Sequence, residues 1–301
     1  MAFKLNQSPA RSIRMTLLLL LAWVGVPPAR HACSSKIFGQ AMSSALISSP
    51  GNASAAAAAF MSSCAGTWSD HDLRRYLASN WKAGGPAGAS CSDAQLFGDY
   101  HDGGKLVCRP RELFKQHCHV LSIGSDGDAS FESSIHAFAP HCVVETHDGT
   151  LIGERAKLRE RLPSFVKLVP TNMDATTYLR LLQDGVEQLS LLKIDCEGCE
   201  FSSLLPLVSH ICVDQIALEL HACQSKGKRS REPTRSFPIG ARHRPFDRAM
   251  RVHTLLSQLD VLYRIFEKQP NFVYSDGTCL EISFIRRVPC EVTVRRGGAG
   301  I

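Results

Sequence analysis

The feature that most constrains this chain is an apolar strand that ends abruptly in a cluster of acids. Leu189–Ile194 is a short, mainly apolar run without a helical period, which is typical of a buried parallel strand. Asp195, Glu197, Gly198 and Glu200 follow at once. The carboxyl ends of strands in an open α/β sheet form the ligand-binding crevice, so these acids indicate a site. The alternative is a solvated loop whose acids favour the start of the next helix.

Similar short apolar runs alternate with helical spacings along the chain. This alternation predicts an α/β fold with a mostly parallel sheet, helices on both faces and a C-terminal antiparallel hairpin. We expect strands near 119–123, 142–147, 165–169, 189–195 and 213–220, and the hairpin near 270–286. We expect helices over 68–81, 131–139, 177–183, 201–207 and 246–266, the last with Met250, Leu255, Leu259 and Leu262 facing inward.

Several motifs resemble those of one enzyme family. Residues 193–201 read Lys-Ile-Asp-Cys-Glu-Gly-Cys-Glu-Phe, which resembles the Lys-Ile-Asp-x-Glu-Gly-x-Glu-aromatic signature of FkbM-type methyltransferases and their eukaryotic methyltransferase-like relatives. Further similar segments follow in the family's order at 102–108, 120–132, 215–221, 266–271 and 279–285. The resemblance covers roughly 102–286 and implies a Rossmann-like sheet that binds S-adenosylmethionine. It also implies O-methylation of hydroxyls, often those of sugars or polyketides.

The turn after the first strand is the expected cofactor site. The segment from Val120 to Glu132 resembles the Ser-Ile-Gly-Ser-x-Gly-x-x-Ser-Phe-Glu form of the eukaryotic relatives, which hold the methionine end of the cofactor here. Glycines let the backbone approach a ligand and take positive φ. Ser122 replaces the acid that usually precedes the first glycine, and Asp126, Asp128 or Glu132 could substitute for that acid. The predicted cofactor-binding residues of this segment are Ser122, Gly124, Asp126 and Gly127.

A carboxylate at the end of the second strand binds ribose hydroxyls in Rossmann-type sites. Spacing from Gly124 favours Glu145 for this role. The family's aromatic-Asp-x-Thr ending instead resembles residues 147–150, so we predict Asp148 and keep Glu145 in reserve.

The acceptor side is predicted at the ends of the fourth and fifth strands. Glu219 and His221 are two residues apart and therefore face the same side of a sheet. We predict that Asp195, Glu197, Glu219 and His221 carry the catalysis, with His221 as the base because its ordinary pKa suits neutral pH. Asp195 and Glu219 could alternatively hold a divalent metal through hard oxygen ligands. No metal ligand is assigned from the sequence.

The N-terminal third of the chain lies outside the segment that resembles the methyltransferase family. Residues 1–32 combine a basic start, a short apolar run and small residues, which predicts a secretory signal, with a membrane anchor as the alternative. Residues 33–101 form an Ala- and Ser-rich stem and extension that carries a glycosylation sequon at Asn52. We place the methyltransferase domain at 102–290 and a tail at 291–301.

The cysteine content and the distribution of charge indicate in which compartment the protein resides and which kinds of partner it binds. Twelve cysteines indicate several disulfides in an oxidising compartment, with a connectivity that spacing does not reveal. Cys196 and Cys199 form the one C-x-x-C, and because no second pair stands at zinc spacing, a zinc site is not expected. A thioredoxin-like redox pair is also not expected, because it would have to share its loop with Asp195 and Glu197. The net charge of +6 gathers largely in 226–248, where a solvated loop explains it better than nucleic acid does.

The sequence therefore favours a methyltransferase of the secretory pathway that uses S-adenosylmethionine and methylates a glycan or small-molecule hydroxyl. The alternative is a catalytically inactive member that binds a partner or glycan, because Ser122 leaves the first motif degenerate. A nicotinamide dehydrogenase fits less well, since Ala129 occupies the place of the third glycine of G-x-G-x-x-G.

Overall fold

The computed structural model describes residues 64, 68–81, 83, 91–100, 103–115, 118–151, 160, 162–222, 244–271 and 278–290. The expected signal, the Asn52 sequon, most of the stem, the basic 226–243 segment and the tail lie outside these ranges. No helix within them is long and apolar enough to cross a membrane. The chain divides into two compact units, one of residues 1–80 with 243–249 and one of residues 81–242 with 250–301.

The first unit contains the helix expected near Trp68. Helix α4 spans Asp70–Ser79, and Ser69 begins it with a capping box in which Ser69 and Asp72 bond each other's backbone N–H. Leu73, Tyr76 and Leu77 lie on one face and are buried, as predicted. Such a cap typically stabilises a helix by about 1 kcal/mol.

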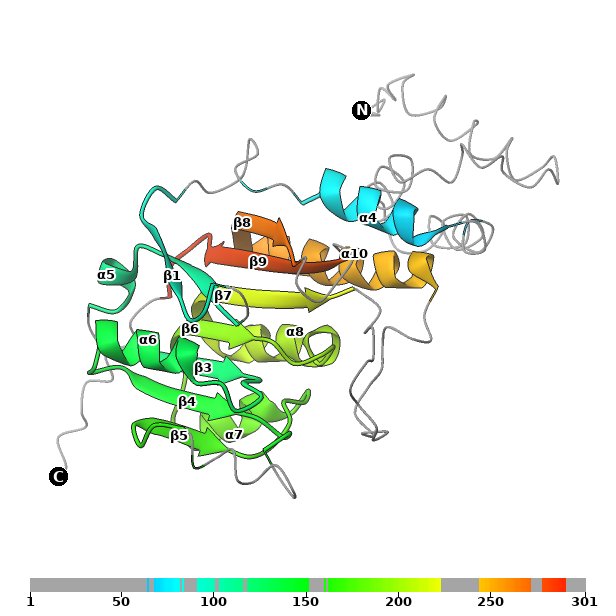
Figure 1. Cartoon of the computed structure of the whole chain (residues 1–301). Coiled ribbons are helices and arrows are strands. Elements are labelled where there is room, and N and C mark those ends of the chain that lie inside the picture. Colours follow the sequence, from blue (N-terminus) through cyan, green and yellow to red (C-terminus); the bar gives the residue numbers. More distant parts are fainter. Residues whose placement is uncertain are drawn as a thin grey trace, which may run out of the picture. The chain divides into compact units, whose positions relative to one another are not determined.

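The second unit is built on a seven-stranded sheet in the order β5-β4-β3-β6-β7-β9-β8 (Figure 1). Five strands of this sheet, β3 to β7, are parallel, and β9 and β8 add antiparallel pairs at one edge. The parallel strands are β3 (His119–Ile123), β4 (Val143–His147), β5 (Val166–Val169), β6 (Gln188–Ile194) and β7 (Cys212–His221). Each lies within two residues of its predicted range, and β6 is central, as a buried apolar strand should be.

Helices cover both faces of this sheet, which confirms the predicted fold class. Figure 1 shows α6 (Ser130–Phe138) on one side and α7 (Thr177–Gln183) and α8 (Glu200–His210) on the other. The chain runs outward from β3 to β4 and β5, returns to β6 beside β3, and continues outward to β7. Right-handed crossovers in opposite directions place the helices on opposite faces, and the reversal between β3 and β6 creates a switch point. The ligand crevice is expected there, at the carboxyl ends of β3 and β6.

The C-terminal end of the fold differs in part from expectation. Helix α10 spans Pro245–Leu262, and β8 (Tyr263–Pro270) begins at the next residue, so the helix predicted over 246–266 is wrong beyond 262. Tyr263 and Phe266 belong to β8 and are buried, although their spacing in the sequence fits one face of a helix. Leu255 and Leu259 are buried as predicted, whereas Met250 and Leu262 are only half-buried. Strand β9 (Cys279–Arg286) closes the predicted hairpin.

A short hairpin that the sequence did not reveal packs on the sheet. It consists of β1 (Ala94–Phe97) and β2 (Lys105–Cys108), followed by the short helix α5 (Pro110–Leu113). The Gln215 side chain on β7 accepts from the Cys108 N–H at 2.9 Å and donates to the Cys108 carbonyl at 2.6 Å. Ser283 Oγ on β9 donates to the Leu106 carbonyl at 3.0 Å. These bonds fix β2 against β7 and β9, and thereby fix the position of Lys105.

Every cysteine in the described ranges is disulfide-bonded, as the cysteine content predicted. Four bonds have both partners described: Cys91–Cys108, Cys118–Cys142, Cys196–Cys199 and Cys212–Cys290. Cys196 and Cys199 of the C-x-x-C pair form a disulfide with each other within the acidic loop. The loop can turn back within three residues because Glu197 (φ 55°) and Gly198 (φ 111°) both adopt positive φ.

Candidate active site

The predicted cofactor turn lies at the carboxyl end of β3, at the switch point. Gly124 and Gly127 have φ of 78° and 82°, and Asp126 also takes a left-handed conformation at φ 50°. A Cβ at Gly124 would lie 1.8 Å from the Asp195 carbonyl oxygen, so only glycine fits where the turn meets the acidic loop. The turn is partly exposed, which leaves its backbone accessible to a ligand.

Asp148 follows β4 and binds the same turn. Its Oδ2 accepts from the Ser125 N–H, the Ser125 hydroxyl and the Asp126 N–H at 2.7–2.9 Å. Its Oδ1 accepts from the N–H and hydroxyl of Thr150 at 2.8 and 2.6 Å. Burial raises the pKa of Asp148, but these bonds outweigh burial and lower it below its ordinary value. Asp148 therefore holds the cofactor turn in shape, whatever it contacts in a complex.

Glu145, the reserve candidate, is committed to a separate ion-pair group. Its carboxylate is 2.5 Å from His147 Nε2 and 2.8 Å from Lys167 Nζ. Burial raises the pKa of Glu145, but these partners lower it to about 2. Glu145 is 1% exposed, so it lies inside the sheet and does not reach the crevice.

A group of buried polar side chains lies next to the turn on β3, β4 and β6. Ser122 pairs in register with Thr146 and with Lys193, whose ammonium donates to the Gly124 carbonyl. Thr146 Oγ1 donates to Glu132 Oε1 at 3.4 Å. Ser122 Oγ and Glu132 Oε2 are buried and have no hydrogen-bond partner among the described residues. Two unsatisfied buried oxygens are costly unless a ligand or water bonds them.

Four predicted catalytic residues gather at the ends of β6 and β7. His221 Nε2 lies 3.8 Å from Asp195 Oδ1, 3.8 Å from Glu197 Oε2 and 3.9 Å from Glu219 Oε1. Asp195, Glu219 and His221 can bring one ligand atom each within 4.8 Å of the others. The Glu197 side chain is 80% exposed and forms the outer side of this cluster, whereas Glu219 and His221 are buried.

Sequence reasoning missed the residues that neutralise and position this cluster. Lys105 on β2 is 2% exposed, and its ammonium lies 3.3 Å from Asp195, 3.8 Å from Glu219 and 2.9 Å from Glu281. Glu219 and Glu281 are direct partners across β7 and β9, a pairing of like charges that is unfavourable without a counter-ion. Asn271 Nδ2 donates to Glu219 Oε1 at 2.9 Å. The signal existed in the sequence, because Lys105, Asn271 and Glu281 all belong to motifs that resemble the family.

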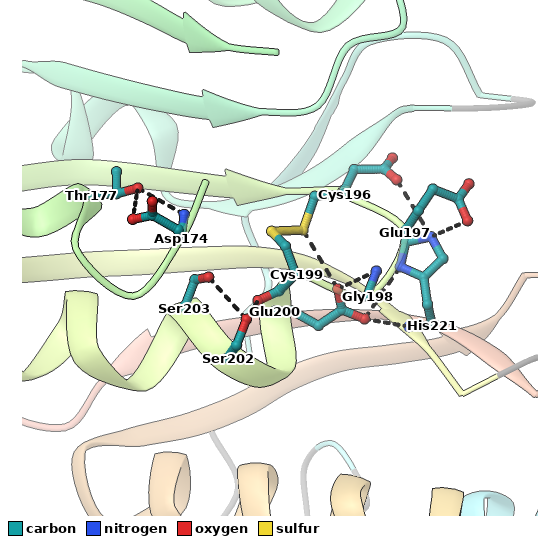
Figure 2. The surroundings of a disulfide bond; sticks show 11 residues. Asp174, Thr177, Cys196, Glu197, Gly198, Cys199, Glu200, Ser202, Ser203 and His221 are labelled. Carbon is teal, nitrogen blue, oxygen red and sulfur yellow. Dashed lines mark hydrogen bonds and ion pairs between the residues drawn. A yellow bond between two sulfur atoms is a disulfide. The ribbon is translucent and has the colours of Figure 1, made fainter. Parts of the chain in front are cut away.

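Glu200 belongs to the acidic segment that the sequence singled out, but it was not among the predicted catalytic residues. It is fully buried at the start of α8, and its Oε1 accepts from the His221 backbone N–H at 2.8 Å and lies 3.3 Å from His221 Nδ1. Its Oε2 accepts from the Gly198 N–H at 2.9 Å. Figure 2 shows Glu200 between the disulfide loop and His221. This carboxylate connects the acidic loop to the end of β7.

The electrostatics of the cluster determine which of its side chains are protonated. Burial lowers the pKa of His221, but Glu200, Asp195 and Glu219 outweigh burial and raise it to about 10. Burial, Asp195 and Glu281 raise the pKa of Glu219 to about 8. Burial opposes ionisation of Asp195, but Lys105, Lys193 and His221 lower its pKa below the ordinary value. At neutral pH His221 is an imidazolium, Glu219 holds a proton and Asp195 is a carboxylate.

This result corrects the reason for choosing His221 as the base. An imidazole pKa near 6.5 would suit proton acceptance, but the neighbouring acidic side chains, chiefly Glu200 and Asp195, raise the pKa of His221 to about 10 and keep it protonated at neutral pH. Two carboxylates with pKa values pushed apart are a common acid–base arrangement. In this cluster Asp195 is the ionised member and Glu219 the protonated one.

Comparison with known proteins identifies the family. Residues 65–286, more than half of the chain, match the family model Methyltransf_22, described as a methyltransferase domain. The curated protein sequences contain no significant match.

Among solved structures, the chain is similar to the Methanococcus jannaschii fibrillarin pre-rRNA processing protein, with 9% identity, a TM-score of 0.37, and 66% of this chain and 85% of that one covered. It is also similar to the N-methyltransferase NodS of Bradyrhizobium japonicum WM9 in complex with S-adenosyl-L-homocysteine, with 14% identity, a TM-score of 0.33, and 59% and 85% covered. At these TM-scores neither similarity carries an argument. The family match and the strand order carry the conclusion that the chain belongs to the Methyltransf_22 family of methyltransferase domains.

Proposed function

We propose that this protein is a methyltransferase that uses S-adenosylmethionine and methylates a hydroxyl group. The family and the sheet topology support the reaction class. The observation that carries the proposal is that the glycine turn after β3 and the charged cluster after β6 and β7 meet at the switch point, where Gly124 abuts Asp195. Within the family, the FkbM-type subgroup and the choice of a hydroxyl acceptor rest on the resemblance of the sequence motifs.

The residues around the turn fit the proposed cofactor. The left-handed turn at 124–127 brings backbone close to a ligand. The unpartnered oxygens of Ser122 and Glu132 could bond an ammonium group, which the methionine end of the cofactor carries. We therefore choose Glu132 among the three acids that could replace the missing one, because Asp126 and Asp128 lie on the exposed side of the turn.

The bound cofactor would supply an activated methyl group on a sulfonium, and the chain would supply orientation and proton removal. A neutral hydroxyl that attacks the methyl carbon becomes a strongly acidic oxonium, so a carboxylate of low pKa suffices to accept its proton. We assign that role to Asp195, which is ionised and 20% exposed in its side chain. The His221 imidazolium would hold Asp195 and Glu197 in place, and protonated Glu219 would donate a hydrogen bond.

A divalent metal fits this cluster poorly. Asp195, Glu219 and His221 offer three ligand atoms, but a cation among them would have to displace the proton of His221 and would lie beside the Lys105 ammonium, which already balances the charge of Asp195. We therefore propose a reaction in which no metal ion takes part. Methyl transfer that is insensitive to chelator is the expected result.

The compartment and the acceptor are also proposals. Four disulfides within the described residues favour an oxidising compartment, such as the lumen of the secretory pathway or the exterior. A glycan or a small molecule is the acceptor that such an address suggests. Alkylation of the denatured, unreduced native protein should find few free thiols, and a majority of reactive cysteines would contradict this compartment.

The decisive experiment measures binding and transfer separately. The full chain purified from a secretory host should bind S-adenosylmethionine at micromolar concentration in calorimetry, and should transfer labelled methyl to a member of a panel of sugar and small-molecule hydroxyls. Asp195→Asn should lower turnover by about 10²–10⁴ and leave cofactor affinity within a few-fold. Asp184→Asn, an exposed acid outside the cluster, is the matched control.

The second candidate function is a non-catalytic binding protein, which the missing acid at Ser122 favours. A folded chain that does not bind S-adenosylmethionine would support that alternative and contradict the proposed enzyme. Cofactor binding together with unchanged turnover in Asp195→Asn would retain the enzyme and show that the proton acceptor is another residue.

A further inference from the structure

The disulfide in the acidic loop differs from the other disulfides in its exposure. Of the four bonds with both partners described, Cys196–Cys199 is the only one in which neither cysteine is buried. The other three each contain at least one buried cysteine: Cys108, Cys118 with Cys142, and Cys290. A thiolate from solution can therefore reach Cys196–Cys199 more easily than it can reach the others.

This disulfide also closes by far the shortest loop. Its cysteines are 3 residues apart, whereas the other three bonds span 17, 24 and 78 residues. A crosslink stabilises a fold mainly by restricting the unfolded chain, and the effect grows with loop length. Stabilisation of the whole fold is therefore a weak explanation for this bond, and a local function explains it better.

The position of the pair favours thiol chemistry. Cys199 is the N-cap of α8, an eleven-residue helix, where the helix dipole stabilises a thiolate. Cys196 Sγ lies 3.5 Å from Glu200 Oε2, which would accept a hydrogen bond from a Cys196 thiol but would disfavour its thiolate. Cys199 is therefore the better leaving group, and Cys196 the sulfur that an incoming thiolate attacks.

The same loop positions the cluster assigned to acceptor chemistry. Glu197 and Gly198 lie inside the disulfide ring, and Glu197 is held at φ 55°, a conformation that is strained for a non-glycine residue. Glu200 bonds Gly198 on one side and His221 on the other (Figure 2). Opening the ring lets Glu197 relax, and removes a constraint on the backbone that carries Asp195 and on the contacts of His221.

We propose that Cys196–Cys199 is a thiol–disulfide exchange site for a dithiol reductant, and that the oxidised form is the one that holds the acidic loop in its active arrangement. One thiolate of the dithiol attacks Cys196 and releases Cys199 as a thiolate, which takes a proton. The second thiolate of the dithiol then displaces Cys196, so the reductant leaves as a disulfide and both cysteines end as thiols. The exchange stands by itself, whereas its effect on turnover rests on the proposed function.

The exchange is tested on the full secreted chain without reference to activity. The protein is equilibrated in mixtures of reduced and oxidised dithiothreitol and quenched in acid, and each cysteine is mapped by differential alkylation and mass spectrometry. Cys196–Cys199 should be half reduced at a ratio of dithiol to disulfide at least about tenfold lower than that of Cys118–Cys142 or Cys212–Cys290. Reduction together with, or after, the buried disulfides would overturn the proposal.

The effect on turnover is tested by reversing the reduction. Selective reduction should lower methyl transfer at least about fivefold, and reoxidation should restore it. The variant Cys196→Ser/Cys199→Ser should have the low activity of the reduced form and should not respond to dithiol. Selective reduction with unchanged turnover, or a double variant as active as the oxidised protein, would overturn the regulatory part. Selective reduction without methyl transfer in either state would instead contradict the proposed function and leave the exchange site intact.

Discussion

At the scale of single residues, the charge balance of the site depends on a buried lysine, Lys105. Lys105 lies against Asp195, Glu219 and Glu281, and the pair of acids across β7 and β9 is tolerable because the ammonium lies beside both members and Glu219 holds a proton. Burial lowers the pKa of Lys105, but these carboxylates outweigh burial and raise it above its ordinary value. The cation is thus part of the structure of the cluster rather than an exposed surface charge.

Lys105→Met should therefore destabilise the protein strongly. Removal of one partner from a buried ionic group typically costs about 3–5 kcal/mol, because the remaining charges are left without compensation. Urea unfolding followed by circular dichroism measures the change. Lys115→Met is the matched control, since Lys115 is exposed and its replacement should change the stability by about 0.5 kcal/mol or less. Equal effects of the two substitutions would contradict the importance of the buried lysine.

Asp148→Ala should weaken cofactor binding, because it removes the acceptor that holds the turn at Ser125 and Asp126 and is predicted to bind the ribose. Charge-assisted hydrogen bonds are worth about 1.5–3 kcal/mol each, which corresponds to roughly a 10- to 100-fold change in Kd. Calorimetry with S-adenosylmethionine measures it. Glu145→Ala should have a smaller effect on Kd, since Glu145 faces His147 and Lys167 within the sheet. The reverse order would show that β4 presents a different carboxylate.

At the scale of secondary-structure elements, the β1–β2 hairpin brings Lys105 to the site from outside the seven-stranded sheet. Gln215 bonds both backbone groups of Cys108 and so attaches β2 to β7. Side-chain bonds to backbone groups replace the ladder that would join two strands of one sheet. The position of Lys105 over the cluster therefore depends on one glutamine and one serine of the sheet, Gln215 and Ser283.

Gln215→Leu should destabilise the protein by about 2–4 kcal/mol, because it leaves a buried N–H and a buried carbonyl of Cys108 unsatisfied. It should also lower turnover, since Lys105 shifts with the hairpin. Gln188→Leu is the control, because Gln188 makes one half-buried bond to Asp214 at the amino-terminal ends of β6 and β7 and should cost below about 1 kcal/mol. Thermal unfolding of both variants checks the difference. Equal shifts in Tm would indicate that other contacts hold the hairpin.

At the scale of the whole molecule, stability should fall as pH rises above neutrality. His221 has its folded pKa raised from 6.5 to about 10, and Glu219 from 4.5 to about 8. In both windows the folded state holds a proton that the unfolded chain has lost. The stability that His221 contributes is therefore complete below pH 6.5 and is lost as pH rises toward 10.

Each such proton changes the free energy of unfolding by about 1.4 kcal/mol per pH unit within its window. Urea unfolding between pH 6.5 and 9 should show a steady fall. His221→Gln should make the fall shallower over this whole range, whereas Glu219→Gln should make it shallower only below about pH 8. Stability that is constant or rises over this range would contradict the assigned protonation states.

The sequence by itself determined the sheet and the places where chemistry could lie. Apolar runs such as Leu189–Ile194 have a single good solution, a buried strand, and the acids that follow must lie at its carboxyl end. The boundary between α10 and β8 was misplaced, because the spacing of Tyr263 and Phe266 fits a helix, and the irregularity in β8 between Ile265 and Glu267 cannot be read from the sequence. The β1–β2 hairpin was not found, since four-residue strands carry too little periodicity.

Only the tertiary structure decided which residues act together and in which charge state. Lys105, Glu219 and Glu281 come from three strands and Asp195 from the loop after β6, and their spacing in the chain gives no measure of their distances in space. The protonation of His221 likewise follows from the acidic side chains that the fold places around it, which local sequence cannot reveal. The Cys196–Cys199 bond required positive φ at Glu197, a backbone state that depends on the surrounding contacts rather than on residue type. Electrostatic and covalent pairing depend on distance in space, and distance in space is set by the fold.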